Sequence, residues 1–201
     1  MLELSIALPI KVQNGGLFIS RGVGRHPARK LTSWEIIFVE KGTLTIQEEN
    51  TLFEVNAGES LLLWPKRRHV GVEDFPGDLK FYWLHFEVDE RLPVLPGATP
   101  LSIEQHCSVR DPQYVIALFR QFLSEQEKLQ RSQALEIILL LILQQISLSP
   151  GYEDKADDAG AAMAWKAKQL IRTHFHLPLS TSQLAKELHC NADYLGRVFR
   201  R

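Results

Sequence analysis

The most constraining feature of this sequence is a pair of short amphipathic segments near its end, separated by a turn of three residues. Apolar residues recur at helical spacing over residues 180–188 and again over residues 192–199. Ser180 and Gln183 predict a capping box at the start of the first helix, and Asn191 is placed to cap the second. Two short helices joined by such a turn cross steeply, which leaves the outer face of the second one free to enter a DNA groove.

That outer face carries side chains suited to reading DNA. Helical sorting places Tyr194 and Leu195 inside and Arg197 outside. A guanidinium can donate two parallel hydrogen bonds to guanine, which discriminates between bases by ~1–3 kcal/mol. Asp193 has two explanations, a favourable position at the helix dipole or a bond accepted from a cytosine amino group. We expect DNA contacts from Ser180, Thr181, Asp193, Arg197 and Arg200.

Charge separates this region from the rest of the chain. Residues 161–201 carry seven Lys or Arg against Glu187 and Asp193, a net charge of +5, whereas residues 1–160 carry a net charge of −6. A basic module is what phosphate contacts require, although solvated helix faces explain such a count equally well. Together with the helical pattern, the charge makes nucleic acid the leading partner.

Two runs of residues match a known pattern. The first contains Leu179, Ser180, Leu184, Ala185 and Leu188, and the second contains Tyr194, Leu195, Arg197, Phe199 and Arg200. They resemble the first helix-turn-helix of the AraC/XylS family of bacterial transcription regulators. The resemblance implies binding to promoter DNA through two such motifs joined by a long helix. The chain ends inside the first recognition helix, so we expect an incomplete DNA-binding domain. His189 stands where the family usually has Gly, at a turn position expected to need φ > 0.

Residues 1 to about 90 show short strands punctuated by turns. The predicted strands are Trp34 to Val39, Thr43 to Glu48, Thr51 to Val55, Ser60 to Trp64, and Leu79 to Val88 as the longest. Short strands at this even spacing indicate an antiparallel barrel or sandwich. The predicted fold class is therefore α+β, with the strands first and helices after them.

A helical hairpin is predicted after the strands. One helix runs from Asp111 to about Gln130, and a second runs from Ser132 to about Ser147. The second helix is apolar around most of its circumference, and one hairpin on a small barrel cannot easily bury all of it. This excess favours a homodimer interface. The alternative is that both faces are covered within one chain.

The sequence argues against a metal site. A catalytic metal commonly has about three His or carboxylate ligands, often with two His at alternate positions of a strand. No His-x-His occurs, and His26, His69 and His85 lie on separate segments. We expect these residues not to converge, and so predict no metal, no cofactor and no enzymatic activity.

A pocket for an uncharged, hydroxylated ligand is better supported. In the longest predicted strand, Phe81, Trp83 and His85 alternate onto one face. Aromatic rings that stack on a sugar, with polar groups near its hydroxyls, would form a site in the mouth of a barrel. The alternative is that these aromatic residues are simply core. The candidate ligand-binding residues are Trp83, His85, Phe81, Trp34, Glu35, Arg25, His26, Trp64 and His69.

The N-terminal order of motifs also resembles the AraC/XylS family. The turn at 57–60 leads to Pro65 and His69, and an aromatic run follows at 82–86. The resemblance implies a cupin-like jelly-roll barrel over residues 1–95, a helical hairpin for dimerisation over 96–149 and a first helix-turn-helix over 161–201. The polar, acidic composition of residues 150–160 predicts a linker between the hairpin and the helix-turn-helix. It also implies a bound sugar, since carbohydrate-responsive members of the family bind sugars inside this barrel.

Length and composition set the remaining expectations. A chain of 201 residues with 45% apolar content can support two domains, and no apolar stretch approaches the ~20 residues that span a membrane. Cys107 and Cys190 are far apart, which is typical of a reducing cytoplasm. We therefore expect a cytoplasmic, dimeric regulator that senses a sugar-like molecule. One alternative is a ligand-binding or dimerisation fragment without DNA binding of its own, and another is a metal-dependent cupin enzyme.

Overall fold

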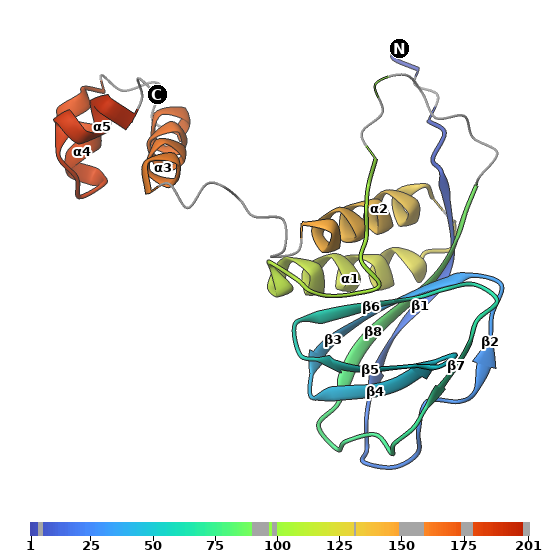
Figure 1. Cartoon of the computed structure of the whole chain (residues 1–201). Coiled ribbons are helices and arrows are strands. Elements are labelled where there is room, and N and C mark those ends of the chain that lie inside the picture. Colours follow the sequence, from blue (N-terminus) through green and yellow to red (C-terminus); the bar gives the residue numbers. More distant parts are fainter. Residues whose placement is uncertain are drawn as a thin grey trace. The chain divides into compact units, whose positions relative to one another are not determined.

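The structure of the chain is a computed structural model that describes residues 1–3, 6–89, 97, 100–130, 132–148, 159–173 and 179–198. It divides into two compact units, Met1–Pro150 and Gly151–Arg201 (Figure 1). Most of the predicted linker over 150–160 lies outside the described residues.

The first unit contains two antiparallel sheets. The five-stranded sheet has the order β1-β8-β3-β6-β9 and the four-stranded sheet has the order β2-β7-β4-β5. The strands are β1 (Ile10–Ile19), β2 (Arg29–Lys30), β3 (Trp34–Lys41), β4 (Thr43–Glu48), β5 (Thr51–Asn56), β6 (Glu59–Leu63), β7 (Arg68–Gly71), β8 (Lys80–Val88) and β9 (His106–Ser108). All pairings are antiparallel, so the predicted sheet-rich, cupin-like barrel is confirmed.

The barrel interior lies between the two sheets. Alternate residues of each strand point to opposite faces, and the interior core combines Ile37 and Val39 of β3 with Leu44 and Ile46 of β4, from the other sheet. These four side chains are no more than 1% exposed. The predicted strand bounds agree closely with the structure, but β1, at ten residues, is longer than β8, at nine, so the expectation that the strand ending at Val88 is the longest is wrong.

Two helices cover the outer face of the five-stranded sheet (Figure 1). They are α1 (Pro112–Gln126) and α2 (Ala134–Ser147). The Asp111 side chain caps α1 by accepting a hydrogen bond from the backbone N–H of Tyr114, and Pro112 is its first residue. Phe119 of α1 stacks on Tyr82 of β8, with ring centroids 5.0 Å apart. The helical hairpin and the barrel therefore share one hydrophobic core.

Helix α2 is only partly buried by this packing. Six of its apolar residues lie in the core: Leu135, Ile138, Leu139, Ile142, Leu143 and Ile146. Ile137 and Leu141, one helical turn apart, remain 42% and 40% exposed, and Leu148 just past the helix is 39% exposed. Helix α1 and the barrel thus cover one face of α2, and an apolar stripe stays on the surface of this unit.

The second unit contains α3 (Ala159–Thr173), α4 (Thr181–Glu187) and α5 (Ala192–Val198). The predicted capping box is present, since Ser180 accepts from the backbone N–H of Gln183 while the Gln183 side chain accepts from the backbone N–H of Ser180. The Asn191 side chain accepts a hydrogen bond from the backbone N–H of Asp193 at 2.7 Å, as predicted for a cap of α5.

The turn between α4 and α5 has the predicted backbone conformation. His189 has φ 51°, in the left-handed region. Leu195 of α5 is fully buried and packs with Leu184 and Ala185 of α4 and with Ala167 of α3. Three helices therefore close a small core of their own. None of the helices in the described ranges is long and apolar enough to cross a membrane.

Candidate functional site

A cluster of ionisable side chains lies in the barrel interior. Glu35 comes from β3, His69 from β7 and His85 from β8, and His26 lies in the loop before β2. All four are buried, with exposed fractions between 2% and 6%. The expectation that the histidines would not converge is wrong, because the two sheets face each other and bring distant segments together.

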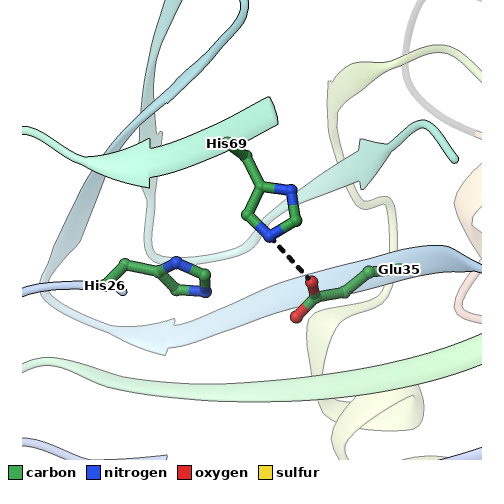
Figure 2. A group of neighbouring side chains, drawn as sticks. All are labelled: His26, Glu35 and His69. Carbon is green, nitrogen blue, oxygen red and sulfur yellow. Dashed lines mark ion pairs between the residues drawn. The ribbon is translucent and has the colours of Figure 1, made fainter. Parts of the chain in front are cut away.

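Three of these side chains point toward one another (Figure 2). His26, Glu35 and His69 each offer one potential metal-ligand atom, and these atoms all lie within 4.8 Å of one another. The Nε2 atom of His69 lies 3.7 Å from Oε2 of Glu35, and the Nε2 atom of His85 lies 3.8 Å from Oε1 of the same carboxylate. Glu35 is therefore the residue that the two strand-borne histidines share.

The loop that carries His26 reaches the cluster because of Gly71 at the end of β7. The backbone N–H of Gly71 donates to the carbonyl of His26 at 2.9 Å. A Cβ atom at position 71 would lie 2.5 Å from the backbone nitrogen of His26 and 2.9 Å from its Cβ. Only glycine permits this close approach, so Gly71 helps to position His26.

The imidazoles differ in their other hydrogen bonds. The Nδ1 atom of His26 lies 3.0 Å from the carbonyl of Pro27 and therefore carries the proton in the neutral ring. The Nδ1 atom of His85 lies 3.4 Å from the Ser33 hydroxyl. Within the described residues, neither ring nitrogen of His69 has a hydrogen-bond partner, and the same holds for Oε2 of Glu35.

Burial shifts the protonation of all four groups. Loss of hydration raises the pKa of Glu35 to about 7, and the nearby Arg29 guanidinium opposes this. Burial lowers the pKa of His69 and of His85 to about 4, with Arg29 acting in the same direction. It also lowers the pKa of His26 to about 4, assisted by His69. At pH 7 the histidines are neutral and present lone pairs.

A cavity of about 210 Å³ adjoins the cluster. Its lining residues are Phe18, His26, Pro27, Arg29, Glu35, Phe75, Phe81 and Trp83. Gly16 of β1 pairs with Trp83 across the sheet, and a Cβ at that position would lie 2.6 Å from the Trp83 ring. The cavity thus joins aromatic faces to a polar end, the combination that a small hydroxylated molecule needs.

The structure brings only part of the predicted ligand site together. Phe81, Trp83 and His85 do share the interior face with Glu35, His26 and His69. Trp34 does not join them, because neighbouring residues of a strand point to opposite faces and Trp34 precedes Glu35. It packs on Trp64 at a ring-centroid distance of 4.6 Å and lines a separate cavity of about 350 Å³ beside α2.

Arg25 also stays apart from the interior. Its guanidinium pairs with the Asp74 carboxylate at 3.0 Å, and both side chains are more than half exposed. The basic residue at the cavity is Arg29 instead, and Phe18 and Phe75 complete the aromatic wall. Sequence reasoning missed these three residues. Residues of a strand alternate between its two faces, and this alternation in β1 could have indicated Phe18. In the structure Phe18 pairs with Phe81 of β8, so both side chains lie on the same face of the sheet.

The residues expected to contact DNA have mixed positions. Thr181, Asp193 and Arg197 are exposed, and the Ser180 side chain is used by the capping box. Arg200 and Phe199 lie outside the described residues. On α5 the structure therefore leaves both Asp193 and Arg197 accessible.

The sequence matches a family of known proteins over most of its first unit. Residues 20–143 match the AraC-like ligand binding domain. A curated relative, "Uncharacterized HTH-type transcriptional regulator YisR" of Bacillus subtilis (strain 168), is 25% identical over 213 aligned positions, which cover 92% of this chain and 72% of that protein.

Solved structures are similar to part of the chain. A cupin 2 conserved barrel domain protein from Salinispora arenicola shares 16% identity over 42% of this chain and 69% of that chain, with a TM-score of 0.33. The protein YhaK from Escherichia coli shares 13% identity over 48% of this chain and 41% of that chain, with a TM-score of 0.36. Neither similarity bears on function.

Proposed function

The chain belongs to the family of AraC-like ligand-binding domains, and from that premise we propose that it is a transcription regulator whose barrel binds a small, sugar-like effector and whose second unit binds promoter DNA. The relative from Bacillus subtilis carries the description of a transcriptional regulator and aligns with 92% of this chain, which supports a regulatory role in the cytoplasm. The same likeness favours a binding protein over an enzyme.

The interior cavity is the observation that carries the effector proposal. The rings of Phe81 and Trp83 offer faces for stacking, while Glu35 and neutral His26 offer hydrogen bonds at the other end. A volume of about 210 Å³ is below the ~300–1,000 Å³ usual for drug-sized ligands. The effector is therefore a compact molecule of monosaccharide size, whose hydroxyl groups hydrogen-bond to the protein.

The second unit supports the DNA-binding half of the proposal. Helix α5 is short, capped at Asn191 and anchored by buried Leu195, which leaves Arg197 and Asp193 exposed. A rigid helix of this kind can present its outer side chains to a major groove. Arg197 is the residue proposed to read a base, and Thr181 at the start of α4 is proposed to contact the backbone phosphates.

The exposed stripe on α2 supports a homodimer. Ile137 and Leu141 lie one turn apart and remain accessible while the opposite face of the helix is buried. Apolar side chains at this spacing pack well against the same stripe of a second copy. A dimer would present two DNA-binding units, and an effector could change how they are presented if it binds the two arrangements with different affinity.

Ligand binding is tested with a panel of monosaccharides and polyols. Binding is followed by thermal shift and by tryptophan fluorescence on the chain as it is, and on Trp83→Leu. We expect at least one member to raise the Tm and to change the fluorescence, and expect both effects to weaken strongly in Trp83→Leu. A matched change at Trp64→Leu, outside this cavity, should keep the ligand-induced Tm rise. If no sugar or polyol acts on the native protein, the proposed effector class is wrong.

DNA binding is tested by selecting sequences from a random duplex library with the chain. Arg197→Ala is compared with Lys166→Ala, an exposed basic residue of α3. We expect Arg197→Ala to lose ~5- to 150-fold in affinity for the selected sequence, the equivalent of one bidentate base contact. Lys166→Ala should change affinity much less. Absence of any enriched sequence would support the ligand-binding fragment without DNA binding of its own.

A further inference from the structure

The cluster at the polar end of the cavity has the composition of a metal site. Two imidazoles and one carboxylate come from three separate segments, all are buried, and their ligand atoms lie within 4.8 Å of one another. We propose that His26, Glu35 and His69 bind a divalent transition-metal ion, with zinc as its representative. This site shares His26 and Glu35 with the effector cavity proposed above, and metal binding there requires neither the effector nor DNA.

The absence of hydrogen bonds among the described groups is the first argument. Buried polar atoms in folded proteins nearly always have a partner, because an unsatisfied buried group costs free energy. Here Oε2 of Glu35 and both ring nitrogens of His69 have none among the described residues. The 3.7 Å between Nε2 of His69 and Oε2 of Glu35 is too long for a hydrogen bond. A cation placed between Oε2 of Glu35 and Nε2 of His69 would give both of these atoms a partner.

The spacing of the donor atoms is the second argument. Zinc bonds of about 2.0–2.2 Å in tetrahedral geometry place two ligand atoms of one ion about 3.3–3.5 Å apart. The 3.7 Å between His69 and Glu35 is only a few tenths of an ångström wider. Small side-chain rotations therefore suffice to bring these two donor atoms to bonding distance of one ion. The ligand atom of His26 lies within 4.8 Å of both, which places it near the same ion.

The partners around the donors are the third argument. Histidines that bind metals usually donate their other ring N–H to a carbonyl or carboxylate, which fixes the ring and its tautomer. The Nδ1 of His26 has this arrangement with the Pro27 carbonyl at 3.0 Å, which leaves Nε2 as the donor atom. The Nε2 atom of His85 lies 3.8 Å from the second oxygen of Glu35, so a small side-chain movement would bring it within hydrogen-bond range of the carboxylate.

The donor set also selects the kind of ion. Imidazole nitrogens suit zinc, iron, nickel and copper, whereas magnesium and calcium prefer sites made only of oxygen. Three protein donors leave at least one coordination position for water or for an oxygen of another molecule. Because His26 and Glu35 also line the cavity beside Trp83, such a position would be available to a molecule in the cavity.

The test measures metal content without DNA or effector. The full chain is treated with EDTA, dialysed against zinc and analysed by elemental mass spectrometry, and cobalt(II) serves as a spectroscopic substitute. We expect one zinc per chain, a Tm raised by zinc, and visible cobalt absorption. Glu35→Gln and His69→Ala should each weaken zinc affinity at least ~100-fold. His106→Ala is the matched control, since His106 pairs with Glu59 at 3.0 Å outside the barrel interior.

The zinc measurements either establish the metal site or overturn it. Zinc binding that Glu35→Gln and His69→Ala abolish and His106→Ala preserves establishes the site, provided that circular dichroism shows the variants folded in EDTA. Zinc retention below one equivalent in the native chain, or retention unchanged in both cluster variants, overturns the proposal. Failure here leaves the regulator proposal intact, because sugar and DNA binding are measured in separate experiments, which are repeated in EDTA. Conversely, loss of sugar and DNA binding would not affect the zinc stoichiometry.

Discussion

The carboxylate of Glu35 faces the imidazole of His69 across the barrel interior, with Oε2 and Nε2 3.7 Å apart and neither side chain more than 4% exposed. Glu35 belongs to the five-stranded sheet and His69 to the four-stranded sheet, so the contact joins the two halves of the barrel. A buried ionisable pair without a hydrogen bond costs free energy in the isolated protein.

Replacement of Glu35 by Gln should stabilise the metal-free protein at alkaline pH. The pKa of Glu35 is raised from 4.5 to about 7, so its contribution to stability is fully present below pH 4.5 and is lost as the pH rises through 7. Gln cannot ionise and avoids this loss. Urea unfolding in EDTA at pH 8 should therefore show Glu35→Gln more stable by about 1–3 kcal/mol, and the advantage should vanish near pH 5.

Glu59 is the control, because its substitution should have the opposite effect on stability. Burial opposes ionisation of Glu59, but hydrogen bonds from Asn56 and His106 outweigh it and lower the pKa of this carboxyl below its usual range. Its contribution is present at neutral pH and is lost on acidification. Glu59→Gln should therefore destabilise the protein at pH 8. Equal signs for the two substitutions would contradict this account of Glu35.

Acid should destabilise the metal-free barrel between pH 6.5 and 4. Burial lowers the pKa values of His26, His69 and His85 from 6.5 to about 4. Between these two pH values the unfolded chain binds more protons than the folded chain, so acidification favours unfolding. The raised pKa of Glu35 has the opposite effect on the pH dependence of stability. The nearby Arg29 guanidinium adds to the lowering of the histidine pKa values. Three histidines outweigh one carboxyl, so the Tm in EDTA should fall as the pH drops from 6.5 to 4, and His69→Gln should reduce the slope.

Local structure was predictable wherever the signal lies within a few residues. The capping box at Ser180 and Gln183 and the positive φ of His189 follow from short-range chemistry, and both are present. The sequence also predicts the strand from Trp34, but the aromatic pattern places Trp34 and Glu35 in one candidate site. Strand alternation separates them onto opposite faces, and that rule alone could have removed Trp34 from the interior set.

The convergence of His26, Glu35 and His69 was not predictable in the same way. It depends on the pairing of sheets across the barrel and on a loop that approaches β7 only because residue 71 is glycine. Search for a metal site by His-x-His spacing assumes that one strand supplies two ligands. Here the candidate donors come from a loop and from two strands in different sheets. No short sequence motif could therefore predict that they lie close together.

Gly71→Ala should disturb this convergence. A Cβ at position 71 would meet the backbone of His26 at 2.5 Å, and backbone atoms cannot yield as a flexible side chain can. We expect a loss of about 1–3 kcal/mol in unfolding free energy, typical of overpacking, together with weaker zinc binding. Gly196→Ala is the control, since nothing lies within 4 Å of a Cβ there and Ala favours helix α5 by up to about 1 kcal/mol. Comparable losses in both variants would argue against a positional role for Gly71.

The apolar stripe of α2 should determine the oligomeric state. Ile137 and Leu141 are 42% and 40% exposed on one side of a helix whose other side is buried in the core, so a charge at either position leaves the fold of one chain unaffected. A charge buried in a dimer interface without a partner is costly. Light scattering after size exclusion should therefore report a dimer for the native chain and a monomer for Ile137→Glu and Leu141→Glu. Leu52→Glu, at a side chain 54% exposed on β5, should remain dimeric, and a native chain that is monomeric at micromolar concentration would refute the proposed interface.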